Sequence, residues 1–503
     1  MLAVRPEAPG QGEHMTTRRE TRVSGWWGMS LALWMTACRT ASAPAPASTE
    51  APEQDTVAFV NVSVVPLDSE RLLAHQTVVV RGERIVALGP TDATPVPAGA
   101  VRVEGQGRYL MPGLVDMHLH LVPGQGQPED PAGHVLALLL ANGVTSARAL
   151  GGPKDSSRVV RDRVARGEVL GPLLHVAAPS MHGKSVKDPE QAHERVREYK
   201  AAGYDGLKTH GFLGRETYDA MMAEARAQGL PVSGHVTPDV GLFHALESGQ
   251  QIEHLDGYLN ELLPENDSAR LVVGQIELGE PLERMDPARI PALAEATREA
   301  GVWSSPTLAL FETVTSPEGV EALAARPELR YAPQAAVKAW TQMLSSDAQM
   351  AGSPVERKRR FAELRRQVAR ALYEAGAKLM VGSDSPQLFM VAGFAVHREL
   401  EALAAAGIPP YGVLEAATRN AAEYLGEAHA WGTVAEGKRA DLLLLEANPL
   451  EDVKHTRDIA GVMVRGHWLP RAELDAMLER TTLAANSPLP MRKNVVTASS
   501  PTP

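Results

Sequence analysis

Apolar residues follow two different spacings along the middle of the chain, between residues 112 and 426. Some segments carry short apolar runs of the length of buried strands. Others repeat apolar residues every three to four positions, as on one face of a helix; the clearest, 216–229 and 361–376, both end in glycine, which is typical of helix ends. The strand candidates are VTSARAL (144–150), LLHVAAP (173–179), GLKTHG (206–211), PVSGHV (231–236), QIEHL (251–255), VWSSPTL (302–308) and KLMVGSD (378–384).

Strand–helix units repeated in this number predict an α/β fold, specifically a TIM (β/α)8 barrel over residues 112–426. The span is compatible with such barrels, which take roughly 250 residues plus insertions. A doubly wound open sheet has the same periodicity, so it stays open as the alternative architecture. The sequence shows neither a Gly-rich nucleotide-binding loop nor an internal repeat.

Both flanks of this region have a different sequence pattern, in which short runs of β-branched residues are separated by turn residues. The first flank contains RGER, a hairpin-like turn around Gly82. The same pattern of short β-branched runs and turn residues follows the central region. We therefore predict one small β-sandwich domain built from two parts, 57–111 and 427–470, followed by a C-terminal tail at 471–503.

Residues 1–38 have the pattern of a secretory signal. Arg18, Arg19 and Arg22 precede the apolar run GWWGMSLALWMTA (25–37), which is shorter than the roughly 20 residues of a membrane-spanning helix. The run is followed by Cys38, and its MTAC ending resembles a bacterial lipobox. A lipidated Cys38 is the prediction, with cleavage and plain secretion as the alternative.

The segment after the signal is rich in Pro, Ala and Ser. Residues 39–56 cannot bury a core and are predicted to form an extended linker. Translation starts at Met1 or at Met15, since residues 1–14 have no evident structural role. We expect the protein in the bacterial cell envelope, as a periplasmic lipid-anchored protein whose anchor is its only membrane contact, or as a secreted one; cell fractionation tests this.

Charge and cysteine content exclude several classes. The 503 residues carry a net charge of −11, which argues against a nucleic-acid-binding protein, since these usually present a basic face. A single cysteine allows neither an intramolecular disulfide nor a Cys-rich metal site. Any metal ion must therefore be held mainly by histidines and carboxylates.

The stretch MPGLVDMHLHL (111–121) places two histidines at alternate positions of a predicted strand. His118 and His120 therefore point to the same face. A packed core gains nothing from paired imidazoles, whereas a metal ion gains two neutral nitrogen ligands. This spacing indicates a metal site to which other strands must contribute.

The ends of the other strands supply candidates for the remaining ligands. In a barrel, catalytic residues lie at the carboxyl ends of the strands. One such position by itself is weak evidence, because a lone strand histidine is more often structural. Together with His118 and His120, the strand ends offer Lys208, His235, His254 and Asp384.

This set of residues resembles that of the amidohydrolase superfamily, in particular its imidazolonepropionase-like and zinc-prolidase-like members. PGLVDMHLHL (112–121) is similar to the signature of the first barrel strand. AATRNAAEYLG (416–426), followed by GTVAEGKRADLLLLEANPL (432–450), is similar to the closing segment. The resemblance covers nearly all of 57–469 and implies a TIM barrel with a β-sandwich built from both chain ends.

The resemblance also implies a binuclear metal site. His118 and His120 would bind the more buried ion, and His235 and His254 the second. Asp384 would ligate the first ion and act as the general base. Two Zn²⁺ ions are the natural occupants, although Mn²⁺ or Co²⁺ would also suit these ligands.

By the same resemblance, Lys208 would bridge both ions after carboxylation by CO₂ to N6-carboxylysine. A protonated ammonium has three donors and no lone pair, so it cannot ligate a cation. A carbamate offers two oxygens and a negative charge. The alternative is a lysine at the surface or in a salt bridge.

Four more residues are expected near the substrate. His182, in APSMHGKS, is expected to be catalytic by contacting the substrate carbonyl oxygen, because relatives often have a Gly-His-Gly-like loop there. His210, Arg148 and Tyr258 are candidates for lining the substrate pocket; the alternatives are a structural role for His210 and, favoured over the pocket, a packed loop aromatic for Tyr258. Arg148 matches an arginine of the relatives, but the acidic residue that commonly follows it is Ala149 here.

The implied activity is hydrolysis of a C–N bond by a metal-bridging hydroxide. Dipeptides, N-acyl amino acids or similar small amides are the expected substrates. One alternative is a mononuclear cyclic-imide hydrolase or deaminase on the same fold, in which Lys208 is incidental; another is a non-catalytic binding lipoprotein of the envelope. Specificity resides in loops, and segments 262–286 and 317–370 are expected as a lid or as a homo-oligomer contact.

Overall fold

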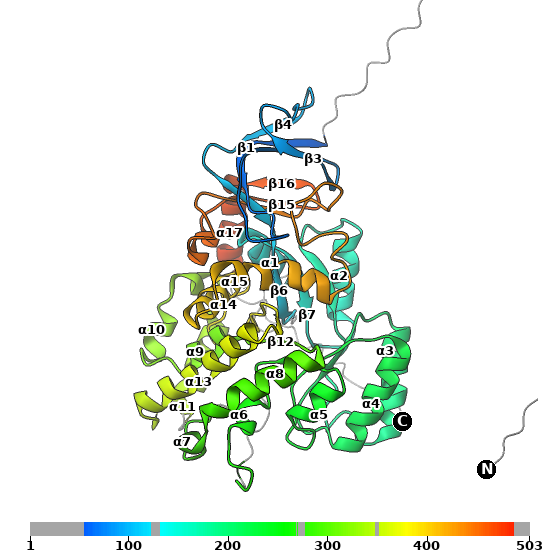
Figure 1. Cartoon of the computed structure of the whole chain (residues 1–503), viewed down its shortest axis with the longest axis vertical. Coiled ribbons are helices and arrows are strands. Elements are labelled where there is room, and N and C mark those ends of the chain that lie inside the picture. Colours follow the sequence, from blue (N-terminus) through cyan, green and yellow to red (C-terminus); the bar gives the residue numbers. More distant parts are fainter. Residues whose placement is uncertain (1–54, 122–130, 268, 270–276, 348–351, 487–503) are drawn as a thin grey trace, which may run out of the picture. The chain divides into compact units, whose positions relative to one another are not determined.

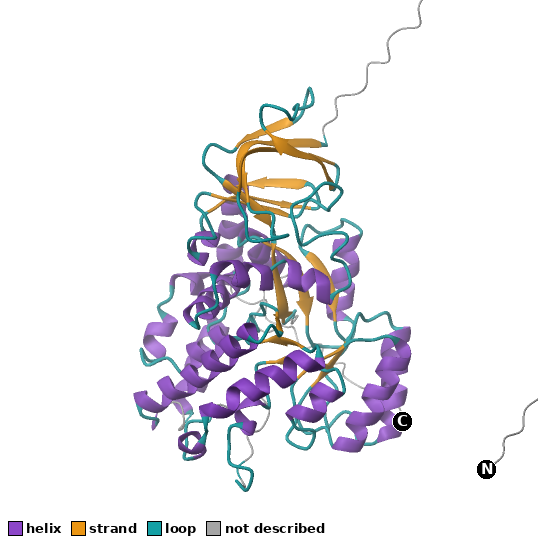
Figure 2. Cartoon of the chain, in the orientation of Figure 1, coloured by secondary structure: helices purple, strands orange, loops and turns teal. Residues whose placement is uncertain are grey.

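The central region of the chain alternates strands with helices, as the spacing of apolar residues predicts (Figures 1 and 2). The computed structural model describes residues 55–121, 131–267, 269, 277–347 and 352–486. Each of the seven strand candidates contains a strand, and MPGLVDMHLHL contains another. These strands are β6 (Leu114–Leu119), β7 (Val144–Ala149), β8 (Leu173–Val176), β9 (Leu207–Thr209), β10 (Val232–Gly234), β11 (Gln251–Glu253), β12 (Trp303–Ser305) and β13 (Lys378–Leu379).

All neighbouring strands of this region pair in parallel. One sheet has the order β6-β7-β8, and the other has the order β13-β12-β11-β10-β9. Isolated parallel bridges link the edges of the two sheets, from Ala177 to Gly206 and from Leu119 to Ser385. The α/β class with parallel sheets is thus confirmed, whereas continuous pairing does not close the strands into one barrel.

The helices of the central region carry their apolar residues toward the sheets. In α4 (Arg215–Gln228), Tyr218 and Met221 are among the buried residues, and the helix ends at Gly229, whose φ of 63° is the left-handed conformation that favours glycine. The remaining helices are α1 (Pro131–Ala141), α2 (Ser156–Ala165), α3 (Pro189–Ala201), α5 (Leu242–Glu247), α6 (Tyr258–Glu261), α7 (Pro281–Arg284), α8 (Ile290–Ala300), α9 (Leu308–Val314), α10 (Val320–Ala324), α11 (Gln334–Ser346), α13 (Val355–Glu374), α14 (Phe394–Ala405), α15 (Pro410–Ala416), α16 (Arg419–Tyr424) and α17 (Arg471–Asn486), with the 3-10 helices η1 (Pro287–Arg289), η2 (Pro327–Tyr331) and η3 (Val453–Arg457).

The two ends of the described chain meet in a third sheet. Its strand order is β16-β15-β14-β5-β1-β2-β3, with β4 paired to β1. The β-sandwich expected from the sequence is not confirmed, because the strands from both flanks pair into this single sheet. Its strands are β1 (Thr56–Val64), β2 (Leu73–Arg81), β3 (Arg84–Pro90), β4 (Val101–Glu104), β5 (Tyr109–Pro112), β14 (Leu442–Leu445), β15 (Ile459–Val464) and β16 (His467–Pro470).

This third sheet leads directly into the first strand of the central region. Only Gly113 separates β5 from β6, and a Cβ atom at this position would lie 2.2 Å from Thr145 Oγ1. A side chain larger than hydrogen therefore does not fit between β6 and β7. This close approach sets the position of β6, and with it the position of His118.

Several predictions fall wholly or partly outside the described residues. The signal segment with Cys38 and most of the linker belong to residues 1–54, and 487–503 end the chain. Residues 471–486, expected as the start of a tail, form α17, which packs against α1. Within the described ranges, no helix combines the length and the apolar character needed to span a membrane.

Candidate active site

The six strand-end residues surround one cavity of about 380 Å³. They reach it from β6, β9 and the segments that directly follow β10, β11 and β13. This is the common edge to which the carboxyl ends of parallel strands point. The cavity is lined by His118, His120, Gly151, Gly152, Ser180, Lys208, His210, His235, His254, Leu310, Phe311, Val314, Asp384, Gln387 and Leu388.

His118, His120 and Asp384 form the tightest group. One potential ligand atom from each lies within 4.8 Å of those of the other two. Asp384 Oδ1 is 2.7 Å from His120 Nε2 and 3.4 Å from His118 Nε2. Two imidazole nitrogens and a carboxylate oxygen at this spacing can hold a divalent ion.

His235 and His254 lie beside this group. Their ring centroids are 4.7 Å apart, and the ring of His254 is 4.6 Å from that of His118. Lys208 Nζ donates a hydrogen bond to His118 Nε2 (3.0 Å). All six predicted ligands are therefore brought together by the fold.

The outer nitrogen of each buried imidazole has a hydrogen-bond partner. His118 Nδ1 is 2.8 Å from Glu253 Oε2, and His235 Nδ1 is 2.6 Å from Asp256 Oδ2. In both rings the Nδ1–H donates to a carboxylate, which leaves Nε2 without a proton; in His118 this nitrogen accepts the hydrogen bond from Lys208. Metal-binding histidines are usually oriented by such a partner, so these residues fit a metal centre.

Burial keeps the imidazoles of His118 and His254 neutral. It lowers the pKa of both well below the usual value of histidine; Lys208 lowers the pKa of His118 further, and His235 and Lys208 lower that of His254. Burial likewise lowers the pKa of Lys208. Neutral imidazole is the form of histidine that can ligate a cation.

Lys208 is unusual because it is buried without a carboxylate partner. Its exposed fraction is 2%, and none of the described carboxylates forms an ion pair with its Nζ. Lysines are almost never fully buried unless they are paired. The surroundings of this side chain therefore match a functional group better than a structural one.

Asp116, a residue of β6, holds two backbone segments that carry candidate ligands. Its carboxylate accepts hydrogen bonds from the backbone N–H of His118 (3.1 Å) and of Ser383 (2.9 Å). Burial raises its pKa to about 6, against the lowering effect of these bonds. Because Ser383 immediately precedes Asp384, this carboxylate couples the positions of His118 and Asp384.

Arg148, expected to line the substrate pocket, lies instead behind the metal centre. It is the residue before the last of β7, and its guanidinium donates to Met117 O (2.8 and 2.6 Å) and Glu253 Oε1 (2.7 Å). The residue is 5% exposed and is not among those that line the cavity. In this structure Arg148 holds Glu253, which in turn holds His118.

We expect Arg148→Met to destabilise the fold strongly. The change leaves the fully buried carboxylate of Glu253 without its guanidinium, and removing one partner of a buried ion pair typically costs about 3–5 kcal/mol. Urea unfolding followed by circular dichroism measures the loss. Arg370→Met, which breaks the exposed pair with Glu374, serves as the control and should change the free energy of unfolding by less than about 1 kcal/mol. Equal effects of the two substitutions would contradict the structural role of Arg148.

The three other residues expected near the substrate have different positions. His210 lines the cavity, and its ring is 4.5 Å from that of His235. His182 lies farther out, with its ring 6.4 Å from that of His210, while Ser180 of the same loop lines the cavity. Tyr258 is fully buried and its hydroxyl bonds to Thr297 Oγ1, so it packs against α8 rather than lining the cavity.

Sequence reasoning missed the residues that orient the ligands. Glu253 and Asp256 flank His254 in the stretch QIEHLD, and Asp116 lies two positions before His118 on the same strand face. For Asp116 and Glu253 the available signal was a charged residue inside an apolar strand, because such a residue must be paired when it is buried; Asp256 follows β11 and lacks this signal.

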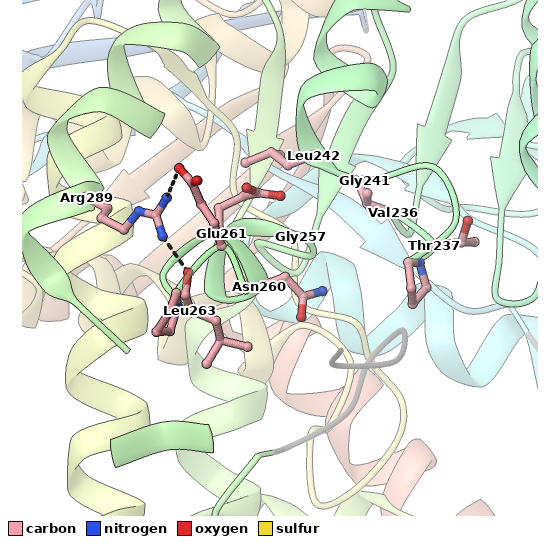
Figure 3. Close-up of a pocket in the computed structure, with 12 residues that line it drawn as sticks. Val236, Thr237, Gly241, Leu242, Gly257, Asn260, Glu261, Leu263 and Arg289 are labelled. Atoms are coloured by element: carbon pink, nitrogen blue, oxygen red, sulfur yellow. Dashed lines mark hydrogen bonds and ion pairs between the residues drawn. The ribbon is translucent and has the colours of Figure 1, made fainter. Parts of the chain in front are cut away.

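A second pocket, of about 200 Å³, lies beyond the ends of β10 and β11 (Figure 3). Val236 and Gly257, which follow these strands, line one part of it. Arg289 lines another part, donates to Leu263 O and lies 3.7 Å from Glu265 Oε1. None of the six predicted ligands lines this pocket.

Comparisons with curated proteins find relatives of partial length. An adenine deaminase from Paracoccus denitrificans is 29% identical over 208 residues, which cover 37% of this chain and 33% of the relative. An imidazolonepropionase from Paenarthrobacter aurescens is 37% identical over 122 residues, which cover 24% and 29%. The matched segments thus span about a third of the length of these relatives.

Comparisons with solved structures extend over most of the chain. A candidate prolidase from Bifidobacterium longum has a TM-score of 0.62 at 25% identity and covers 86% of this chain and 100% of its own. A Xaa-Pro dipeptidase with bound methionine in the active site has a TM-score of 0.61 at 18% identity, covering 82% and 100%; at that identity the likeness concerns the fold alone. Residues 109–469 match the model of the amidohydrolase family. Because this match spans more than half of the 503 residues, the chain belongs to the amidohydrolase family.

Proposed function

We propose that this protein is a metal-dependent hydrolase that cleaves the C–N bond of a small amide, such as a dipeptide or an N-acyl amino acid, at a binuclear site. The observation that carries the proposal is the convergence of four imidazoles, a buried lysine and Asp384 on one cavity. The outer hydrogen bonds of His118 and His235 support it, because they prepare these rings as ligands.

The six residues would divide between two ions. His118, His120 and Asp384 would hold the first, and His235 with His254 the second, while a carboxylated Lys208 would bridge them. When bound, divalent ions such as Zn²⁺ lower the pKa of a water molecule and polarise the carbonyl group of an amide. We further propose that the eight parallel strands act as one barrel around this centre, as is typical of the family's fold.

Asp384 would carry the proton of the reaction. Its carboxylate lies at the cavity beside His120, so it can take a proton from the attacking water. It can then deliver that proton to the nitrogen of the breaking C–N bond. The same side chain thus serves as general base and general acid in turn.

His210 and His182 can orient the substrate carbonyl. The backbone N–H of Gly211 donates to His210 Nδ1 (2.8 Å), and that of Lys184 donates to His182 Nδ1 (3.1 Å). An imidazole nitrogen that accepts a hydrogen bond carries no proton, so the proton of each neutral ring is on Nε2. Each ring therefore offers an N–H donor, and His210, which lines the cavity, is the closer of the two to the ligands.

Metal removal and reconstitution test this function. Protein treated with a chelator should lose hydrolysis of a panel of dipeptides, N-acetyl amino acids and simple anilides, and Zn²⁺, Mn²⁺ or Co²⁺ should restore it. Release of amine, followed with an amine-reactive dye, is the measurement. Chelator-insensitive hydrolysis would contradict the proposal. Activity confined to cyclic imides or aminopurines, with one ion per chain, would favour the mononuclear alternative instead. The group of His118, His120 and Asp384 is sufficient to hold that one ion.

A further inference from the structure

One side of the active-site cavity is apolar. Leu310, Phe311 and Val314 of α9 line it together with Leu388, which follows Asp384 by four residues. The three α9 side chains belong to residues that are 5–6% exposed, so only their cavity-facing surface is accessible. We call these four residues the apolar wall. Ser180, His210 and the two glycines that follow β7 also line the cavity.

The apolar wall is held rigidly from behind. Glu399 of α14 accepts hydrogen bonds from the backbone N–H groups of Leu308 (3.0 Å) and Ala309 (2.7 Å), which begin α9. Arg365 of α13 stacks on the ring of Phe311 at 3.6 Å. Helices α13 and α14 both pack against α9 (Figure 1). Side chains fixed in this way can select substrates by shape, because binding a substrate costs little further loss of side-chain freedom.

The described lining of the cavity offers a carboxylate no cationic side chain except Lys208. Lys208 is the only lysine or arginine among its described lining residues, and it belongs to the metal centre. The guanidinium of Arg365 donates to His254 O (2.6 Å) and Pro306 O (3.3 Å) behind the wall. Arg289 lines the separate pocket of Figure 3, where Leu263 and Glu265 engage it. A free carboxylate pressed against the apolar wall would be desolvated without a partner, which is costly.

The position of Asp384 decides which part of the substrate meets the apolar wall. Hydrolysis adds water to the carbonyl carbon, and the C–N bond then breaks with its electron pair going to nitrogen. The nitrogen leaves as an amine after taking a proton from Asp384, so it must lie within hydrogen-bond distance of that carboxylate. The ring of Phe311 lies 6.1 Å from that of His254, whose Nδ1 is 3.7 Å from Asp384 Oδ2, whereas the ring of His210 lies beside His235 at 4.5 Å. A substrate whose nitrogen lies at Asp384 therefore has its nitrogen substituent on the side of α9 and its carbonyl oxygen on the side of His210.

We propose that the apolar wall is the subsite for the leaving amine and that it selects an uncharged apolar substituent on nitrogen. The preferred substrates are then N-alkyl or N-aryl amides, in preference to dipeptides or N-acyl amino acids whose leaving amine carries a free carboxylate. This inference rests on the proposed function, because it assigns the orientation of an amide that is hydrolysed at this site.

Two near-isosteric pairs of probes test the inference on the metal-loaded protein. On the amine side, 4-methylacetanilide is compared with 4-acetamidobenzoate; on the acyl side, 4-methylbenzamide is compared with 4-carboxybenzamide. We expect the neutral anilide to be favoured at least about tenfold over its anion in kcat/KM. The preference should be several-fold smaller in the acyl-side pair. If none of the four is hydrolysed, equilibrium dialysis gives the same comparison as Kd values.

Two substitutions in the apolar wall sharpen the test. Leu310→Lys should abolish or reverse the preference for the neutral anilide, because it supplies a cation to the carboxylate. Leu388→Lys repeats the change on a half-buried loop residue, in case the helical variant does not fold. Leu483→Lys, at a residue of α17 that is 66% exposed, is the matched control and should keep the preference.

The outcomes separate the inference from the function on which it rests. Hydrolysis of both anilides with equal kcat/KM, or equal Kd values in dialysis, would overturn the apolar subsite. Selective binding of the neutral anilide without metal-dependent hydrolysis would leave the subsite in place and reject the proposed function. A preference that both lysine variants retain would show that the apolar wall does not cause it.

Discussion

Replacing Lys208 with alanine is expected to lower kcat/KM for a hydrolysed amide by about 10³-fold or more, and to reduce the metal content from two ions per chain to one or none. The reason is geometric. Lys208 is buried between the two histidine groups, with its Nζ 3.0 Å from His118 Nε2 and no carboxylate partner among the described residues. A carbamate at this position could reach both groups, whereas alanine leaves the second ion with two imidazoles only.

Elemental analysis of wild type and variant side by side is the measurement. Lys200→Ala, at an exposed position of α3, is the control and should keep both ions and full activity. Because a carbamate is chemically a carboxylate, acetate added to Lys208→Ala should restore part of the activity, and expression and assay without CO₂ should impair the wild type. Two ions in both proteins would reject the bridging role. One ion in both would demote Lys208 and favour cyclic-imide or deamination substrates.

Most strands of the central region could be predicted because they are buried on both faces. In β6, β7, β9, β10 and β11 every residue is buried, so these segments do not alternate between apolar and polar residues as a half-exposed strand does. The end of α4 at Gly229 could be predicted for a local reason as well, since its left-handed φ favours glycine.

Long-range pairing could not be predicted in the same way. The pairing of β5 with β14 joins Leu110 to Leu444, and nothing in either short run specifies this partner. For the same reason the sequence predicted that the two flanks form one β-domain but not which of their strands pair, and the sandwich arrangement expected there is not confirmed. Periodicity reports burial, whereas sheet topology depends on contacts between distant segments.

The metal ligands could be predicted because one geometric rule applies to all of them, namely that parallel strands end at a common edge. Arg148 shows where the rule stops. It matched an arginine of relatives, but it lies within β7, and the residues that follow the strand, Gly151 and Gly152, line the cavity instead. Side chains one layer behind the ligands, such as Glu253 and Asp256, obey no such rule, because their positions depend on the residues they hold.

Asp384→Asn is expected to lower kcat by about 10²–10⁴-fold, the range that general acid–base catalysis contributes, with a smaller effect on KM. Asparagine keeps the shape of the side chain and one carbonyl oxygen near His120 and His118, but it cannot take up and release a proton. Asp452→Asn, which changes a carboxylate that caps η3 far from the cavity, is the matched control and should leave kcat unchanged.

Metal content decides how the loss of activity in Asp384→Asn is interpreted, because Asp384 is proposed both as a ligand and as the proton carrier. A variant that retains both ions but has lost kcat would assign the loss to proton transfer. A variant that has lost the first ion would instead assign it to ligation, and excess metal in the assay should then recover part of the rate. Full activity with both ions bound would exclude Asp384 from proton transfer. The orientation of the leaving amine against α9 would then lose its basis, since that orientation follows from the proton that Asp384 delivers.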